Sequence, residues 1–174
     1  MFIQKVRLAD KKIKQIYEDS FTKNERMPFV LMVAMSKLWN TEFLSFYEND
    51  IPCGFIYFAK NSRIVFIMFF AVSEDMRSKG YGTLILNEIK KMYPSEKIIV
   101  SIEPCLEQSS DEELCIRRKN FYLRNGFRES GYNMRLNKTD QEILVANGDF
   151  NKRQFISFFA HYSNGTVWPK IWKT

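Results

Sequence analysis

Cysteine and histidine are scarce in this chain of 174 residues, and their scarcity limits the chemistry available to it. The three cysteines, Cys53, Cys105 and Cys115, are odd in number and lack the C-x-x-C spacing of zinc and redox motifs. They predict neither a disulfide framework nor a metal site, and a reducing cytoplasm is the expected location. His161 is the only histidine, so a histidine base is not expected.

Long apolar segments and clustered basic residues are absent as well. The longest apolar run covers residues 64–72, about half of a membrane-spanning helix, so no association with a membrane is expected. The net charge is +6, but the basic residues are dispersed and form no stripe typical of nucleic-acid binders. We therefore expect no nucleic-acid partner. The charge fits a solvated surface or the steering of a polyanionic cofactor.

The hydrophobic content of 45% is sufficient for one sizeable core, so one domain is expected. Apolar periodicity predicts helices that begin near residues 10, 29, 83, 111 and 151, the second of them apolar around most of its circumference and hence buried. Alternating or continuous apolar runs predict strands over residues 2–8, 41–47, 53–60, 63–72, 97–102, 132–137 and 142–146.

The most informative segment joins the strand of residues 63–72 to the helix of residues 83–93 through an R-x-x-G-x-G motif formed by Arg77, Gly80 and Gly82. Two glycines at this spacing allow a turn whose backbone N–H groups face one anion at a helix start, and Arg77 and Lys79 add full charges. The alternative is a purely structural turn. Spacing excludes the dinucleotide G-x-G-x-x-G motif and the P-loop, which leaves coenzyme A among common ligands.

A second landmark lies about forty residues further on, where Phe121-Tyr122-x-x-x-Gly126-Phe127 is typical of a helix that ends in a glycine C-cap. The two motifs, in this order and with a strand between them, resemble the GNAT family of acetyl-CoA-dependent N-acetyltransferases. The resemblance covers roughly residues 1–146. It implies an α+β fold (α/β three-layer) with a mixed, mostly antiparallel sheet of about seven strands flanked by helices.

The resemblance also implies where the cofactor binds. Pantetheine would pair with the strand end at Phe70, Ala71 and Val72, where a backbone N–H polarises the thioester carbonyl. The pyrophosphate would lie in the cradle formed by Arg77, Ser78, Lys79, Gly80, Tyr81, Gly82 and Thr83. Acetyl-CoA is the implied cosubstrate, without a metal.

Tyr122 occupies the position where the family often places a general acid, and the alternative is a tyrosine that only packs in the core. Many relatives have an asparagine seven residues before it, where this chain has Cys115. The candidate base is Glu103, directly or through water. Glu25 and Glu103 are the candidate contacts to a cationic substrate, since Glu103, Glu107, Asp111, Glu112 and Glu113 form an acidic run. Acids that favour a helix dipole explain the run equally well.

These features predict an N-acetyltransferase that moves an acetyl group directly to a primary amine of a small molecule or peptide. The alternative is a non-catalytic acyl-CoA-binding regulatory module of the same fold. Residues 1–146 would form the catalytic domain, and residues 147–174 a C-terminal helical extension packed on it, with Phe155, Phe158, Phe159 and Tyr162 as its apolar stripe. A dimer contact through that stripe is the other possibility, so monomer and homodimer both stay open.

Overall fold

The computed structural model describes residues 1–105, 112–136 and 139–174. These residues form two compact units, one of Met1–Lys60 with Ile67–Met92 and one of Asn61–Phe66 with Tyr93–Thr174. Within them the α+β class is confirmed, with mostly antiparallel strands flanked by helices. Eight strands are present in the described residues, one more than the sequence patterns predict, because the short β8 (Lys170–Lys173) has no alternation long enough to be recognised.

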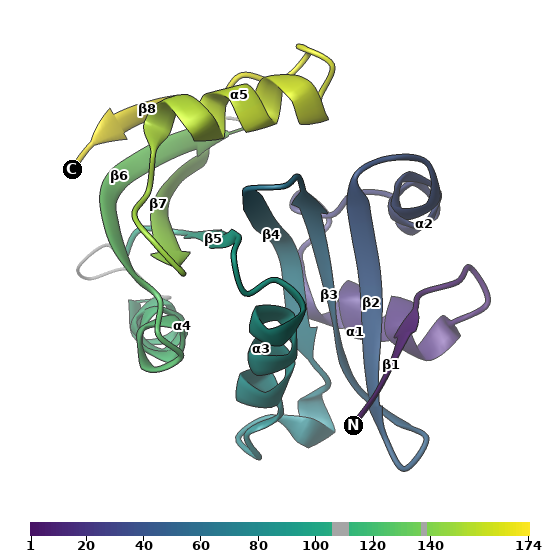
Figure 1. Cartoon of the computed structure of the whole chain (residues 1–174). Helices are drawn as coiled ribbons and strands as arrows, with labels where there is room; N and C mark the ends of the chain where they lie inside the picture. Colours follow the sequence, from purple (N-terminus) through teal and green to yellow (C-terminus); the bar gives the residue numbers. More distant parts are fainter. Residues whose placement is uncertain (106–111, 137–138) are drawn as a thin grey trace. The chain divides into compact units, whose positions relative to one another are not determined.

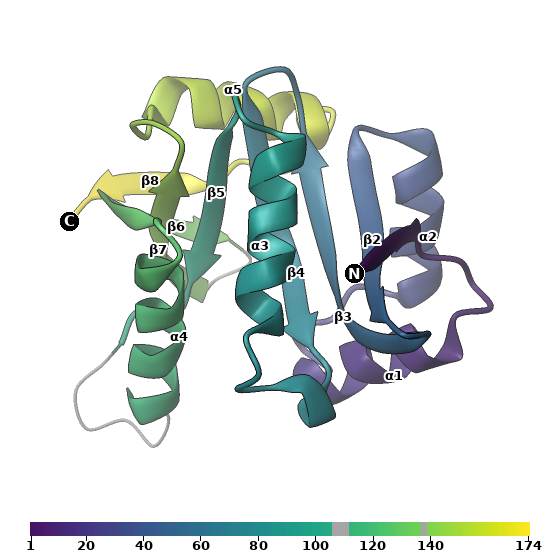
Figure 2. The same cartoon turned by 60° about the horizontal axis from the view of Figure 1, so that its bottom comes forward.

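The first unit has strands in the order β1 (Phe2–Lys5), β2 (Thr41–Glu48), β3 (Ile51–Lys60) and β4 (Ile64–Val72), the first three residues of β4 belonging to the second unit. The β1–β2 and β2–β3 pairings are antiparallel. Helices α1 (Lys11–Ser20) and α2 (Phe29–Leu38) lie on one face of these strands and α3 (Tyr81–Met92) on the other (Figure 2). Aromatic rings fill the space under α1 and α2, among them Tyr17, Phe29, Phe43, Phe55 and Phe69.

The expected burial of the second helix is wrong in part. Phe29, Met32 and Val33 of α2 are buried, but Val30 and Leu38 are 63% and 72% exposed. A helix that is apolar on all sides gives no sequence signal for which face meets the sheet. The helix therefore leaves an apolar face uncovered within the described residues.

The second unit has strands in the order β5 (Lys97–Ile102), β7 (Thr139–Ala146), β6 (Arg128–Leu136) and β8, and all three pairings are antiparallel. Helices α4 (Glu112–Arg124) and α5 (Lys152–Tyr162) lie on opposite sides of β6 and β7 (Figure 1). The Asn151 side chain accepts a hydrogen bond from the Gln154 N–H and so caps α5. Phe155 and Phe159 of α5 are buried, and each ring centroid lies 5.3 Å from that of Phe66.

No helix among the described residues is both long enough and apolar enough to span a bilayer. The described residues also contain no group of three or more His, Cys, Asp or Glu side chains placed to hold a metal ion.

The prediction that the cysteines form no disulfide is wrong, because Cys105 and Cys115 are bonded, with Cα atoms 5.4 Å apart. Cys105 follows β5, and Cys115 is the fourth residue of α4. The odd count misled the prediction, since the third cysteine, Cys53, is buried in β3 and simply left over. Ten residues of sequence separation do not show that two segments return to each other, so only the tertiary structure reveals the pair.

Candidate active site

The R-x-x-G-x-G motif forms the turn between β4 and α3. A short 3-10 helix over Glu74–Met76 precedes it, and the backbone then reaches left-handed φ values at Ser78 (61°) and Gly80 (85°). The first α-helical bond runs from the Leu84 N–H to the Gly80 carbonyl at 3.1 Å. The N–H groups of the preceding helical residues therefore point out of the amino-terminal end of α3, where the helix dipole also favours an anion.

Two cationic side chains at this turn have no partner anion among the described residues. The Arg77 and Lys79 side chains are exposed and take part in no ion pair within the described part of the chain. Arg77 Nε makes only a long hydrogen bond of 3.4 Å to the Val72 carbonyl, which ties it to the end of β4. The turn thus presents outward N–H groups and two uncompensated positive charges, as a phosphate or pyrophosphate requires.

The end of β4 is packed tightly against β3. The Ser73 N–H donates to the Cys53 carbonyl at 2.8 Å, and Gly54 lies where a Cβ atom would be 2.4 Å from the Ala71 carbonyl oxygen. Only glycine permits this approach. Gly54 therefore determines the position of the backbone at Phe70, Ala71 and Val72, a role that the sequence patterns did not reveal.

Tyr122 lies in the last turn of α4, in the second unit, and its side chain is 6% exposed. Its ring packs on Phe121 and Phe127, with centroid separations of 5.3 Å. The hydroxyl makes no hydrogen bond to any described residue and is not among the fully enclosed polar atoms that lack a partner. Burial raises the pKa of Tyr122 and nearby Arg118 lowers it, with burial dominant, so the phenol stays protonated at neutral pH.

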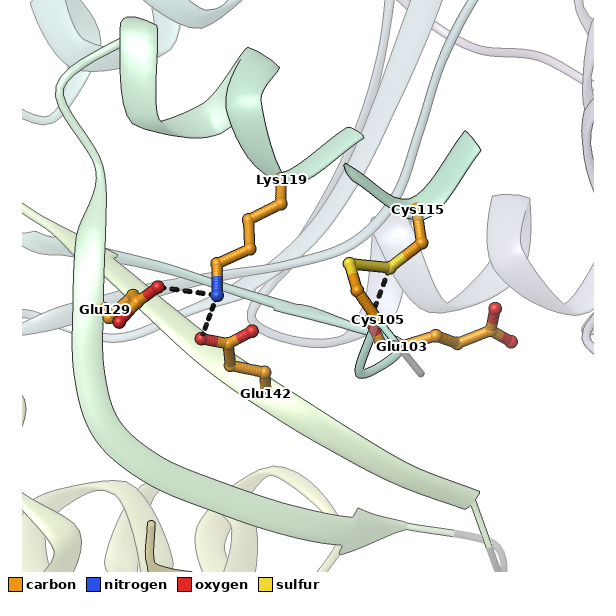
Figure 3. The surroundings of a disulfide bond; sticks show 6 residues. All are labelled: Glu103, Cys105, Cys115, Lys119, Glu129 and Glu142. Carbon is orange, nitrogen blue, oxygen red and sulfur yellow. Dashed lines mark hydrogen bonds and ion pairs between the residues drawn. A yellow bond between two sulfur atoms is a disulfide. The ribbon is translucent and has the colours of Figure 1, made fainter. Parts of the chain in front are cut away.

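Glu103 follows β5 and is exposed. Its carbonyl oxygen lies 3.2 Å from Cys115 Sγ, next to the Cys105–Cys115 disulfide, whereas its carboxylate points away from that disulfide (Figure 3). Two other acids of the proposed acidic run, Glu107 and Asp111, lie outside the described residues. Glu103 and Tyr122 thus belong to segments that the disulfide joins, because Cys115 and Tyr122 share α4.

Residues 39–129, just over half of the chain, match the family described as the acetyltransferase (GNAT) domain. The chain belongs to the GNAT acetyltransferase family. The resemblance inferred from the two motifs is therefore confirmed.

Solved structures agree with this GNAT assignment at the level of the fold. A GNAT-family protein from Bacteroides thetaiotaomicron has a TM-score of 0.72 at 20% identity, with 92% of this chain and 94% of that chain covered. The aminoglycoside 6'-N-acetyltransferase from Enterococcus faecium has a TM-score of 0.61 at 13% identity, covering 84% and 96%. The PaiA N-acetyltransferase from Thermoplasma acidophilum, solved with coenzyme A, has a TM-score of 0.56 at 15% identity, covering 83% and 97%. No curated protein matches the chain.

Glu25, the other candidate substrate contact of this GNAT protein, lies in the loop between α1 and α2 and is engaged locally. Its Oε2 accepts hydrogen bonds of 2.7 Å from both the N–H and the hydroxyl of Thr22. These bonds hold the turn that begins at Thr22, so one carboxylate oxygen already has a structural use. The loop is anchored further by the Tyr17 hydroxyl, which accepts from the Met27 N–H at 2.8 Å and donates to the Met27 carbonyl at 3.1 Å.

Beside this loop the first unit of the GNAT protein has an open cavity of about 510 Å³, a size typical of small-molecule sites. Apolar Leu8 and Val30 line it together with charged Lys14, Glu18 and Arg26. Lys14 Nζ lies 3.8 Å from Glu18 Oε1 in an ion pair, whereas Arg26 has no ion pair in the described part of the chain. The sequence patterns did not predict this cavity, although Glu25 in the bordering loop was a candidate substrate contact.

Sequence reasoning also missed an ion cluster on the second unit. Lys119 Nζ of α4 lies 2.5 Å from Glu129 of β6 and 2.9 Å from Glu142 of β7 (Figure 3). Burial lowers the pKa of Lys119, but hydrogen bonds with the two carboxylates outweigh burial, so the pKa is raised overall. The cluster fixes α4 to two strands and so helps to position Tyr122, three residues further on.

Proposed function

We propose that the chain is an acetyl-CoA-dependent N-acetyltransferase that transfers the acetyl group directly to a primary amine of a small molecule or peptide. The observation that supports it most is the turn from Arg77 to Thr83. Outward N–H groups, two cations that form no ion pair with a described residue, and a helix amino terminus fit the pyrophosphate of coenzyme A. Structural neighbours solved with coenzyme A support the same ligand.

Residues of this chain can perform each step of the binding and transfer. Ser78, Lys79, Gly80, Tyr81 and Gly82 hold the diphosphate, together with Arg77 and Thr83 at the two ends of the turn. The backbone of Phe70, Ala71 and Val72 pairs with the pantetheine arm, and one of its N–H groups stabilises the oxyanion that forms on the thioester carbonyl.

Tyr122 then donates a hydrogen bond to the departing thiolate. The conjugate acid of a thiolate has a pKa of about 8.5, and burial holds the pKa of Tyr122 far above that value. Full proton transfer from the phenol is therefore uphill, and stabilisation by a hydrogen bond is the better-matched role. Glu103 is the proposed base, directly or through water, and Glu25 and Glu103 are the proposed contacts to the acceptor's ammonium group.

Direct transfer is supported by the state of the cysteines. Cys53 is buried, and Cys105 and Cys115 are bonded to each other. While the disulfide is formed, none of the three is an exposed free thiol that could carry the acetyl group between substrates. Initial-rate lines at several fixed amine concentrations should therefore intersect, whereas parallel lines would indicate an acetylated enzyme and contradict direct transfer.

The decisive test combines binding with turnover. Acetyl-CoA should raise the thermal midpoint, because a ligand bound only by the native state stabilises it, and a panel of primary amines should release free thiol. Gly82→Trp should abolish the thermal shift, while Gly131→Ala, in β6 of the second unit and with no atom within 4 Å of the added Cβ, should keep it. A full shift in Gly82→Trp would contradict the cradle. A shift without turnover on any amine would favour the non-catalytic acyl-CoA-binding module.

A further inference from the structure

We propose that Cys105 and Cys115 form a thiol–disulfide exchange site for low-molecular-weight thiols, and that exchange there controls how firmly the start of α4 is held at the end of β5. Neither cysteine belongs to the cradle or to the proposed chemistry. The pair is the covalent link between the segment of Glu103 and the helix of Tyr122 (Figure 3).

The exposure of Cys105 and Cys115 favours exchange with small thiols. Both cysteines are partly exposed, whereas Cys53 is buried. Exchange requires a thiolate to reach one sulfur of the disulfide, so an enclosed bond would be inert and a partly exposed bond is labile. In a reducing cytoplasm, the expected location of this chain, disulfides are usually transient or redox-sensing rather than structural.

The surroundings of Cys115 favour it as the leaving thiolate. It lies in the first turn of α4, where the helix dipole stabilises the negative charge of a departing thiolate. Arg118 is a helical neighbour three residues on, and it is exposed without an ion pair within the described residues. Glu112 and Glu113 oppose these effects from the same turn, and Lys119 is already engaged by Glu129 and Glu142.

The exchange is balanced as two steps. A thiolate attacks Cys105 Sγ, the S–S bond breaks with its electron pair going to Cys115, and a mixed disulfide remains on Cys105. A second small thiolate then attacks the small-molecule sulfur of this mixed disulfide. The electron pair goes to Cys105 Sγ, the small disulfide departs, and two protein thiols remain. The protein disulfide gains two electrons and two small thiols lose them, and the small disulfide reverses the reaction.

The consequence for α4 follows from helix geometry. Cys115 and Tyr122 are seven residues apart, which places them on one face of the helix about 10 Å from each other. Lys119 fixes the middle of α4 to β6 and β7, while the disulfide is the covalent tie of its first turn. Reduction therefore releases that turn and leaves the remainder of the helix docked.

The test uses the full chain in buffers whose ratio of reduced to oxidised thiol varies, with glutathione in one arm and coenzyme A in the other. Samples are acid-quenched and alkylated after denaturation, and labels are counted by mass. We expect a change from one label to three with a midpoint inside the range. If the midpoint differs between the arms and coenzyme A exchanges more readily, the natural partner is the thiol product of the proposed reaction. Equal midpoints for glutathione and coenzyme A would indicate exchange with small thiols in general. A disulfide that resists every ratio, or one that never forms, would overturn the proposal.

Two variants and a local measurement complete the experiment. Cys53→Ser should keep the midpoint and lower each label count by one, and Cys115→Ser should leave Cys105 able to take up one small thiol. Hydrogen exchange of the first turn of α4 should become at least several-fold faster on reduction, while the helix end near Tyr122 changes little. Equal protection of that turn in the oxidised and reduced proteins would overturn its control by the disulfide. These readouts need no turnover, so they stand or fall independently of the acetyltransferase proposal.

Discussion

Replacing Gly54 with alanine tests how the end of β4 is positioned. The new Cβ atom would lie 2.4 Å from the Ala71 carbonyl oxygen, 3.1 Å from Val72 Cα and 3.2 Å from Ile85 Cδ1, whereas ordinary contact begins at 3.4 Å. The backbones of β3 and β4 must therefore separate by about 1 Å. Two of the three obstructing atoms belong to the backbone and cannot rotate away.

Two opposing effects determine how far Gly54→Ala changes the free energy of unfolding. Overpacking costs about 3 kcal/mol, at the upper end of the usual range because the neighbours are rigid. Alanine recovers about 0.5–1 kcal/mol because glycine is unfavourable inside a strand. The net loss of about 2 kcal/mol should lower the thermal midpoint by about 4–8 °C in a domain of this size. A strand displaced by about 1 Å should also lower turnover by about 100-fold.

Thermal unfolding with and without acetyl-CoA, together with initial rates of thiol release, measures both effects. The matched control is Gly131→Ala, where φ is +73° and no atom obstructs a Cβ. That variant has only backbone strain, about 1 kcal/mol, and should keep wild-type kinetics and the full acetyl-CoA shift. Wild-type stability and turnover in Gly54→Ala would refute the reasoning, and so would equal kinetic defects in the two variants.

Three further substitutions test individual side chains. Tyr122→Phe keeps the ring and removes the donor, so turnover should fall by about 10-fold to 1,000-fold with acetyl-CoA affinity little changed, and an unchanged chemical step would exclude the role. If Glu103 is the base, Glu103→Gln should abolish the lower limb of the pH–rate profile. If Glu103 only attracts the substrate, the substitution should raise only the Michaelis constant for charged amines. Wild-type kinetics in this variant would exclude both roles. Tyr17→Phe leaves the Met27 N–H and carbonyl without their partner and should cost about 1–3 kcal/mol in urea unfolding. Burial raises the pKa of Tyr17 from 10.0 to about 12, against the lowering effect of the Met27 hydrogen bond, so between these pH values the native state keeps a proton that the unfolded state loses. Stability should therefore fall by about 1–2 kcal/mol as the pH rises through this window, after discounting for solvent near the hydroxyl, and Tyr17→Phe should flatten that decline.

The family and the order of elements were readable from the sequence because they depend on local chemistry. Glycines at a two-residue spacing after an apolar strand specify the turn at Arg77 to Gly82, and the left-handed φ of 75° at Gly126 is the predicted C-cap of α4. The last helix was likewise predicted to begin near residue 151, where the Asn151 side chain caps α5. Each of these signals acts within a few residues of its own position.

Features that join distant segments were decided only by the tertiary structure. The Cys105–Cys115 bond, the ion cluster at Lys119 and the close approach at Gly54 depend on which strand or helix returns to which place, and periodicity contains no such information. The exposed side of α2 is a related case, because an all-apolar helix does not encode its own orientation. Sequence periodicity thus determines each element, whereas the contacts that place a backbone, a charge or a thiol arise from packing between elements that are remote in the chain.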